Sequence, residues 1–171
     1  VVHYNASEDE AREVVGEIDV SGGEASLVGG DVSDADEVGR MLGEIEDGFG
    51  RLDVLVNNAG SLIERRTLAE MTEDLWDRVM DVNLKSVYLV SRAVLPIMRR
   101  QGSGRIINMT SIAARNGGGP GSIAYATAKG GVSTLTRAMA KELVSENILV
   151  NGVAPGVITT PFHDRFTPPD V

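Results

Sequence analysis

The chain has 171 residues, of which 42% are hydrophobic and 24% are charged, and its formal net charge is −9. This length suits one domain with its own core, and the composition is that of a globular protein. The sequence shows no basic patch for nucleic acid, no cysteine for disulfides or thiol chemistry, no metal-ligand pattern, and no apolar run near the roughly 20 residues of a membrane span, so the cytoplasm is the default location.

Short apolar runs alternate along the chain with longer stretches in which apolar residues recur at helical spacing. The apolar runs are Val1–Tyr4, Ala25–Gly30, Leu52–Asn57, Arg105–Met109 and Ile148–Val153. Each is rich in valine, isoleucine or leucine and alternates too little for a half-exposed strand, which indicates strands buried on both faces. The stretches that indicate helices are Glu8–Asp19, Ala35–Phe49, Glu73–Arg100 and Ile123–Glu146.

Side chains at the helix ends support these boundaries. Ser33 or Asp34 is placed to cap the second helix, and Thr72 the third. Pro96 should kink or end the third helix because proline lacks the backbone N–H. Strands that alternate with helices at this spacing predict right-handed βαβ units. The expected fold is a doubly wound α/β domain, a parallel sheet with helices on both faces (a Rossmann fold).

Small and polar residues follow three of the expected strands. In such sheets ligands bind beyond the carboxyl ends of the strands. The three segments are Asn57–Gly60, Thr110-Ser111 and Ala154–Thr160. A site lined by glycine, proline and backbone lets a flat ligand approach closely.

Tyr125 and Lys129 are four residues apart, so they share one face of the last helix. A tyrosine has an ordinary pKa of about 10, and a nearby ammonium group stabilises the phenolate and lowers that pKa toward the working pH. Such a phenol can act as a general acid or base. Taken alone, this spacing could equally be a chance surface pair.

The joint pattern of motifs resembles the short-chain dehydrogenase/reductase family in order and spacing. The segments that carry the resemblance are Asn57-Asn58-Ala59-Gly60, Asp81-Val82-Asn83-Leu84, Ser111, Tyr125 with Lys129, and Pro155-Gly156. The resemblance covers essentially the whole chain, from the family's second strand to just past its sixth. It implies hydride transfer between a nicotinamide cofactor and a carbonyl or alcohol substrate.

The resemblance also implies roles for four catalytic residues. Tyr125 would be the acid or base at the carbonyl oxygen, and Ser111 would hold and polarise that oxygen. Lys129 would lower the pKa of Tyr125 and bind the nicotinamide ribose. Asn83 would hold a water that links the lysine to solvent.

The same resemblance places a set of residues at the cofactor. They are Asp31, Val32, Asn57, Ala59, Gly60, Tyr125, Lys129, Pro155, Gly156, Ile158 and Thr160. Within this set, Asp31 and Val32 would meet the adenine ring. The backbone of Ile158 and the hydroxyl of Thr160 would hold the nicotinamide carboxamide.

The sequence departs from the family at both ends. The Gly-rich loop that carries the pyrophosphate is absent, as are the family's first strand and its last helix and strand. We therefore expect an incomplete single NAD(P)-binding domain, Val1–Val171, from a parent of roughly 250 residues. The missing first strand predicts a vacant lane between Val1–Tyr4 and Leu52–Asn57. The family resemblance predicts a homotetramer for the parent.

Three functions remain open for the parent. Asn116–Gly121, which could also be a plain surface loop, and Phe162-His163 resemble family members that act on sugars, polyols or keto acids. The general motif set resembles 3-oxoacyl-carrier-protein reductases equally well. Such an enzyme would benefit from basic residues near the pocket mouth, where the candidates are Arg65, Arg66, Arg115 and Arg165. A non-catalytic protein that kept the fold is the third reading.

We expect NADP to be preferred over NAD, because the stretch His3–Ser7 at the end of the first expected strand contains no acidic residue. An acid there would accept a hydrogen bond from the ribose 2′-hydroxyl and repel a 2′-phosphate. Replacing Tyr4 or Asn5 with Asp should shift the ratio of kcat/KM values toward NAD. A wild-type preference for NAD would contradict this reading of the strand end.

Overall fold

The computed structural model describes residues 1–158, 160, 162 and 166. Its strands are β1 (Val2–Tyr4), β2 (Leu27–Gly29), β3 (Val54–Asn57), β4 (Gly104–Met109) and β5 (Ile148–Val153). Its helices are α1 (Glu8–Val20), α2 (Ala35–Phe49), α3 (Glu73–Met80), α4 (Ser86–Gln101), α5 (Ala113–Asn116) and α6 (Ile123–Leu143). A π-helical turn, Asp81–Lys85, joins α3 to α4, and a 3-10 turn, Val144–Glu146, follows α6. The expected α/β alternation is confirmed; the short helix α5 and the π-helical turn were not predicted.

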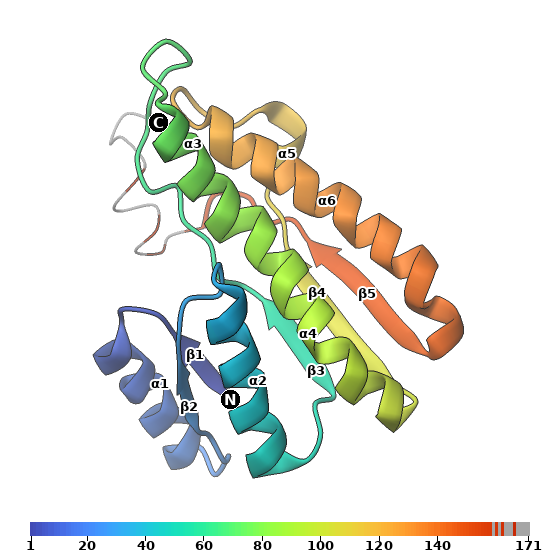
Figure 1. The fold of residues 1–171 in the computed structure, drawn as a ribbon. Helices are drawn as coiled ribbons and strands as arrows, with labels where there is room; N and C mark the ends of the chain where they lie inside the picture. Colours follow the sequence, from blue (N-terminus) through green and yellow to red (C-terminus); the bar gives the residue numbers. More distant parts are fainter. Residues whose placement is uncertain (159, 161, 163–165, 167–171) are drawn as a thin grey trace.

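The described strands form two parallel sheets rather than one (Figure 1). One sheet pairs β1 with β2, and the other has the order β3-β4-β5. No described strand pairs with both β1 and β3, and the sequence predicts a missing strand at this position between the two sheets. The width of that lane stays a prediction.

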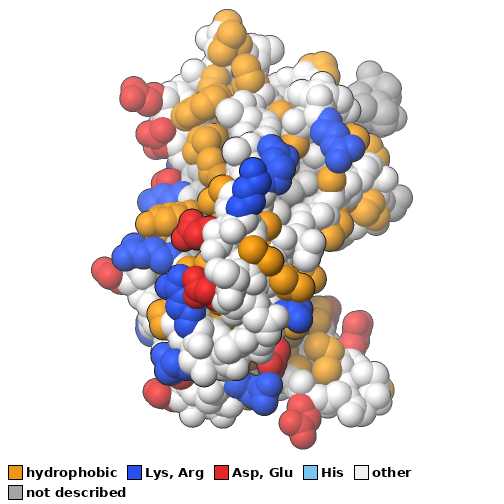
Figure 2. Space-filling model, turned by 90° about the vertical axis from the view of Figure 1, so that its right-hand side faces the viewer, with side chains coloured by type: hydrophobic (Ala, Val, Ile, Leu, Met, Phe, Trp, Pro, Cys, Tyr) orange, Lys and Arg blue, Asp and Glu red, His pale blue; other side chains and the backbone are white. Residues whose placement is uncertain are grey.

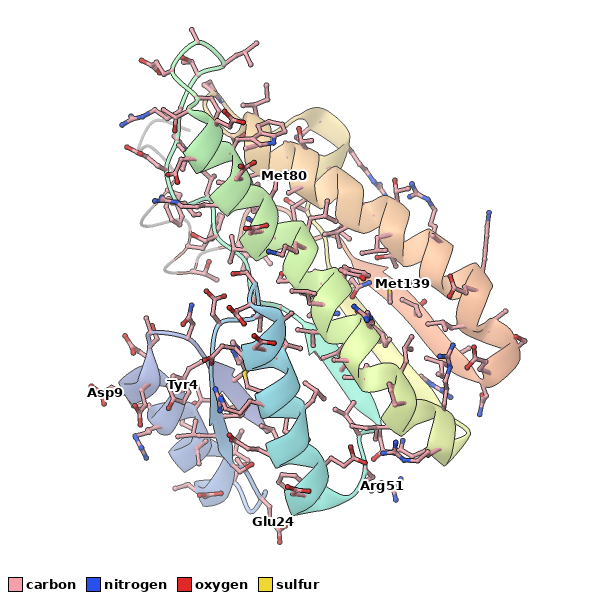
Figure 3. All side chains as sticks on the ribbon, in the orientation of Figure 1. Tyr4, Asp9, Glu24, Arg51, Met80 and Met139 are labelled. Carbon is pink, nitrogen blue, oxygen red and sulfur yellow. The ribbon has the colours of Figure 1, made fainter. Side chains whose placement is uncertain are left out.

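Helices cover one face of the β3-β4-β5 sheet (Figure 1). Helix α4 packs on β3 and β4, and α6 packs on β4 and β5. The core between them includes Ile106, Ile148 and Met98, which are fully buried. Figure 3 labels Met139, a residue of α6 that also packs against this core.

The other face of the same sheet carries apolar side chains that remain exposed. Val54 and Val56 of β3 are 54% and 51% exposed, and Val153 of β5 is 47% exposed. The expectation of strands buried on both faces is therefore wrong for the described residues, because no described helix packs on these side chains. Figure 2, which views the molecule from its α6 and β5 side, shows apolar side chains exposed between charged ones.

Side-chain caps begin α2 and α3 as the sequence predicts. Asp34 accepts hydrogen bonds from the backbone N–H groups of Asp36 and Glu37, so it, rather than Ser33, caps α2. Thr72 accepts from Leu75 N at the start of α3. In the described part of the chain, none of the helices is long and apolar enough to cross a membrane.

Pro96 does not end its helix, contrary to one of the two expected outcomes. Helix α4 continues through it to Gln101. Burial of Val94, Ile97 and Met98 on either side of the proline explains this, because their packing against the core outweighs one lost backbone hydrogen bond.

A buried chain of hydrogen bonds ties the sheet to both covering helices. Asn57 Nδ2 donates to Ser91 Oγ of α4 at 3.0 Å and to Asn108 Oδ1 of β4 at 2.8 Å. Asn108 Nδ2 in turn donates to Thr136 Oγ1 of α6 at 2.9 Å. All four side chains are buried, and such groups fix the position of the elements that carry them since an unpaired partner would be costly.

Gly104 lies where a side chain has no room. A Cβ at this position would lie 2.7 Å from Met98 Cγ, and Met98 is fully buried. We expect Gly104→Ala to lower the free energy of unfolding by about 1–3 kcal/mol. Gly43→Ala is the matched control, because nothing lies within 4 Å of a Cβ there, and helix α2 should gain about 0.5–1 kcal/mol. Equal stabilities of the two variants in chemical denaturation would contradict this packing.

Candidate active site

The candidate site lies where β4 ends and α6 begins. Lys129, on the buried face of α6, is only 3% exposed. Its Nζ donates a hydrogen bond to the carbonyl oxygen of Met109, the last residue of β4, at 2.9 Å. The same Nζ lies 5.7 Å from the centroid of the Tyr125 ring. The structure therefore brings the two predicted residues together and fixes the lysine to the strand end.

Tyr125 stands in apolar surroundings. It packs, with Ile63 and Trp76, against the small buried cluster of Leu75, Val79 and Ala124. The ring of Phe162 lies 5.7 Å from the Tyr125 ring, centroid to centroid. At its polar end, the tyrosine forms a side-chain hydrogen bond with Ser111.

Burial raises the pKa of Tyr125 above its ordinary value, and the hydrogen bond with Ser111 lowers it only in part. The sequence predicts the opposite direction, a pKa lowered by Lys129. The difference arises because removing the phenolate from water is the larger effect. This burial favours the protonated phenol.

Burial also favours the neutral form of Lys129. The cost of burying the ammonium lowers the pKa of Lys129 from 10.5 to about 8. Both members of the pair therefore shift toward their uncharged forms. At pH 8 a substantial fraction of Lys129 is neutral.

Asn83 lies in the π-helical turn and is fully buried. Its Oδ1 accepts from Ser61 N at 3.2 Å, and its Nδ2 donates to Ser61 O at 2.6 Å and to Val79 O at 2.9 Å. Both amide hydrogens are thus committed to protein carbonyls. The predicted water contact of Asn83 would therefore have to come from an atom other than Nδ2, such as its backbone carbonyl oxygen.

Gly60 packs against two of the predicted catalytic residues. A Cβ at this position would lie 2.8 Å from Asn83 Oδ1 and 3.2 Å from Lys129 Nζ. Sequence reasoning placed Gly60 beside the cofactor and missed this second constraint, as it missed Ser61. The sequence around Gly60 cannot show whether the glycine makes room for a cofactor or for neighbouring side chains. The side chains that a Cβ would meet come from α6 and from the π-helical turn, which are remote in the chain.

Ser111 is the second residue after β4, and its Oγ also accepts from Ala113 N at 3.1 Å. A cavity of about 410 Å³ borders Ser111 on another side, where it is lined by α6 residues that include Ser133 and Arg137. Neither Tyr125 nor Lys129 is among the described residues that line it. Ser111 is thus the residue that this cavity shares with the candidate catalytic set.

The residues expected at the adenine end are spread over two strand ends. Asn57 turns its side chain into the interior, so any contact with a cofactor would come from its backbone. Asp31 accepts hydrogen bonds from the backbone N–H and the hydroxyl of Ser33, and Val32 packs partly against the core. Ala59 follows at the end of β3, next to Gly60. The adenine contacts of Asp31 and Val32 stay predictions.

The segment after β5 continues the site past the strand. Ile112 N donates to Pro155 O at 2.9 Å, which holds the Pro155-Gly156 turn beside the end of β4. Ile158 is 53% exposed, and Thr160 Oγ1 donates to its carbonyl oxygen at 3.3 Å. Their predicted contact with a carboxamide remains a prediction, and His163 and Arg165 lie outside the described residues.

The end of β1 contains the residues expected to choose between NAD and NADP. The ring of Tyr4, labelled in Figure 3, lies against Gly29, where a Cβ would meet it at 2.7 Å. His3 is a strand residue, as predicted, and its Nε2 donates to Gly30 O at 2.8 Å. The nearby acid, Glu8, is paired with Arg12. The strand end itself carries no acidic side chain.

The fold and the site agree with a match of residues 1–170 to the family model described as "short chain dehydrogenase". The chain belongs to the short-chain dehydrogenase family.

Two curated relatives and one solved structure illustrate the likeness. The chain is 47% identical to a 3-oxoacyl-[acyl-carrier-protein] reductase of Synechocystis sp., over 94% of this chain and 64% of the relative. It is 45% identical to the Staphylococcus epidermidis protein of the same name, over 93% of this chain and 64% of the relative. A crystal structure titled as a putative short-chain dehydrogenase/reductase from Burkholderia xenovorans superposes with a TM-score of 0.86 at 33% identity, covering 94% of this chain and 62% of that one. The chain thus spans a little under two thirds of each.

The lowered pKa of Lys129 predicts a pH-dependent stability. Between the folded pKa of about 8 and the unfolded value of 10.5 the unfolded chain binds more protons, so stability rises with pH in this window. The free energy of unfolding of the full-length protein, measured relative to Lys129→Met, should rise by up to about 2–3 kcal/mol from pH 8 to pH 10. A difference that stays constant over this range would contradict a buried, destabilised ammonium.

Proposed function

We propose that the full-length protein containing this chain reduces the 3-oxo group of acyl thioesters to a hydroxyl group, with a nicotinamide cofactor as hydride donor. The observation that carries the proposal is the constellation of Ser111, Tyr125 and Lys129 at the end of β4, where partial burial of the tyrosine favours its protonated form. The two relatives named as 3-oxoacyl-[acyl-carrier-protein] reductases support the substrate class.

The site suits a nicotinamide cofactor on steric grounds. Gly60 packs without a side chain against Asn83 and Lys129, and the Pro155-Gly156 turn is held beside the end of β4, so small residues border the site at two strand ends. The residues that would hold the cofactor are those at the ends of β2, β3 and β5. When bound, it would supply the hydride.

This chain's own residues would handle the substrate oxygen and its proton. Ser111 and Tyr125 would donate hydrogen bonds to the carbonyl oxygen and polarise it. As negative charge develops on that oxygen, the Tyr125 hydroxyl would transfer its proton to it. Lys129 would support the resulting phenolate, because a proton on its Nζ is stabilised by a nearby anion. Since burial keeps the phenol protonated, Tyr125 is held in the proton-donating form that reduction of a carbonyl requires.

The apolar surroundings favour an acyl substrate over a sugar or keto acid. Phe162 was expected to help form a pocket for a polar substrate, but its ring lies against Tyr125. Ile63 and Trp76 line the same region. Aliphatic and aromatic side chains bind an acyl chain by burial of apolar surface, whereas they leave hydroxyl groups unpaired.

NADP as the preferred cofactor and a homotetrameric assembly complete the proposal. The lack of an acidic residue at the end of β1 supports NADP. For the assembly, Leu143 and Met139 offer no support, because both pack into the chain's own core. Tyr88 of α4, 47% exposed, is an apolar group that remains available for contact.

Tyr125→Phe should abolish turnover while cofactor affinity stays nearly unchanged, because the ring and its packing remain and only the transferable proton is lost. We expect a loss of at least about a thousandfold in kcat for acetoacetyl thioester reduction, in the range of a missing general acid. Tyr88→Phe removes the same group from an exposed tyrosine and is the matched control. Activity of Tyr125→Phe within tenfold of the wild type would remove Tyr125 from this role.

A further inference from the structure

We propose that Arg65 is a positioning residue of the substrate site, which holds Phe166, and through its ring Phe162, in place beside Tyr125. The proposal rests on the proposed function for its consequence in catalysis. The contact itself does not depend on the identity of the substrate.

Arg65 connects segments that are far apart in the sequence. It lies in the loop after β3, and its Nη1 donates to the carbonyl oxygen of Pro120 at 2.8 Å. Its Nε donates to the carbonyl oxygen of Phe166. One planar guanidinium thus joins the loop before α6 to the segment after β5, which only the fork of donors in arginine can do in this geometry.

The stem of Arg65 is fixed by close contact between two loops. Arg66 N donates to Gly121 O at 3.0 Å. Gly121 has a φ of +74°, and a Cβ on it would lie 3.0 Å from Arg65 Cβ and 3.1 Å from Arg66 N. The loops therefore approach so closely that Gly121 has to be glycine, and the arginine has little freedom to move away.

The same loop is anchored at its other end to the catalytic site. Ile63 has a φ of 60°, a conformation that a β-branched residue rarely adopts. Its N–H donates to Ser61 Oγ at 3.0 Å, and Ser61 binds the amide of Asn83 through its backbone. Because Ile63 packs against the cluster beside Tyr125, this packing offsets the strain of the turn. The loop is thus fixed at Ser61, through Asn83, and at Arg65, through Pro120.

A row of aromatic rings transmits the position of Phe166 to the tyrosine. The Phe166 and Phe162 rings lie 5.1 Å apart, centroid to centroid, at 60°. The Phe162 and Tyr125 rings lie 5.7 Å apart at 41°. These distances are those of favourable aromatic pairs. Arg65 therefore stabilises one wall of the site by holding the backbone of Phe166, whose ring is the outermost of the row.

This use of the guanidinium distinguishes Arg65 from a docking cation for an acidic partner. Both of its observed hydrogen bonds go to carbonyl groups of the chain itself. Its neighbour Arg66 is paired with Glu64. A role in docking would require only the charge, whereas the positioning role requires two donors in a fixed fork.

The test uses the full-length protein and three variants, Arg65→Met, Arg65→Lys and, as the matched control, Arg66→Met. With acetoacetyl-coenzyme A as substrate, both Arg65 variants should raise KM at least tenfold and leave kcat and the cofactor Kd within about threefold, while Arg66→Met stays within twofold of the wild type. The double variant Arg65→Met with Phe162→Leu should raise KM by less than the product of the two single fold-increases, because both changes disturb the same wall of the site.

Hydrogen exchange measured by mass spectrometry provides a readout that does not require turnover. Peptides that contain Phe166 should exchange at least fivefold faster in both Arg65 variants and at the wild-type rate in Arg66→Met. If exchange changes in this way but the wild type does not reduce the thioester, the proposed function fails and the positioning role stands. Unchanged exchange in Arg65→Met, equal effects of Arg66→Met, or full recovery of KM by Arg65→Lys would overturn the positioning role.

Discussion

The burial of Lys129 behind Tyr125 is the constraint on which the rest of the site depends. The ammonium group reaches the carbonyl oxygen of Met109 and lies within 5.7 Å of the tyrosine ring. Placing a lysine there costs desolvation energy, which appears as its pKa of about 8. The surrounding structure meets this cost because α6 packs against β4 and β5. The buried hydrogen bonds from Asn57 through Asn108 of β4 to Thr136 of α6 add to this packing.

Burial also sets the protonation states that the pair favours. It raises the pKa of Tyr125 and lowers the pKa of Lys129, so each group is favoured in its neutral form. A neutral phenol is a proton donor, which is the form that the reduction of a carbonyl requires. The apolar rings and aliphatic side chains around Tyr125 are thus more than a binding surface, because they are the source of the shift. Under the proposed function, recognition of an acyl chain and retention of the proton on Tyr125 would share one physical cause.

Much of the fold was accessible from the sequence, since buried parallel strands and amphipathic helices have distinct periods. The expected site residues Ser111, Tyr125 and Lys129 do meet at one strand end. Contacts that depend on three-dimensional packing were not accessible. Gly60 against Asn83, the π-helical turn, the continuation of α4 through Pro96 and the exposed face of β3 all depend on neighbours remote in the chain. The direction of the Tyr125 shift was missed for the same reason, because spacing along a helix says nothing about desolvation.

The central claim is that desolvation, and not the lysine charge, dominates the titration of Tyr125 in the absence of cofactor. Ultraviolet difference titration of the full-length wild type against Tyr125→Phe measures this most directly, since the phenolate absorbs at longer wavelength than the phenol. The account predicts that the phenolate of Tyr125 forms only above the ordinary tyrosine pKa of about 10. A Tyr125 phenolate that forms at or below pH 8 in the free protein would contradict it.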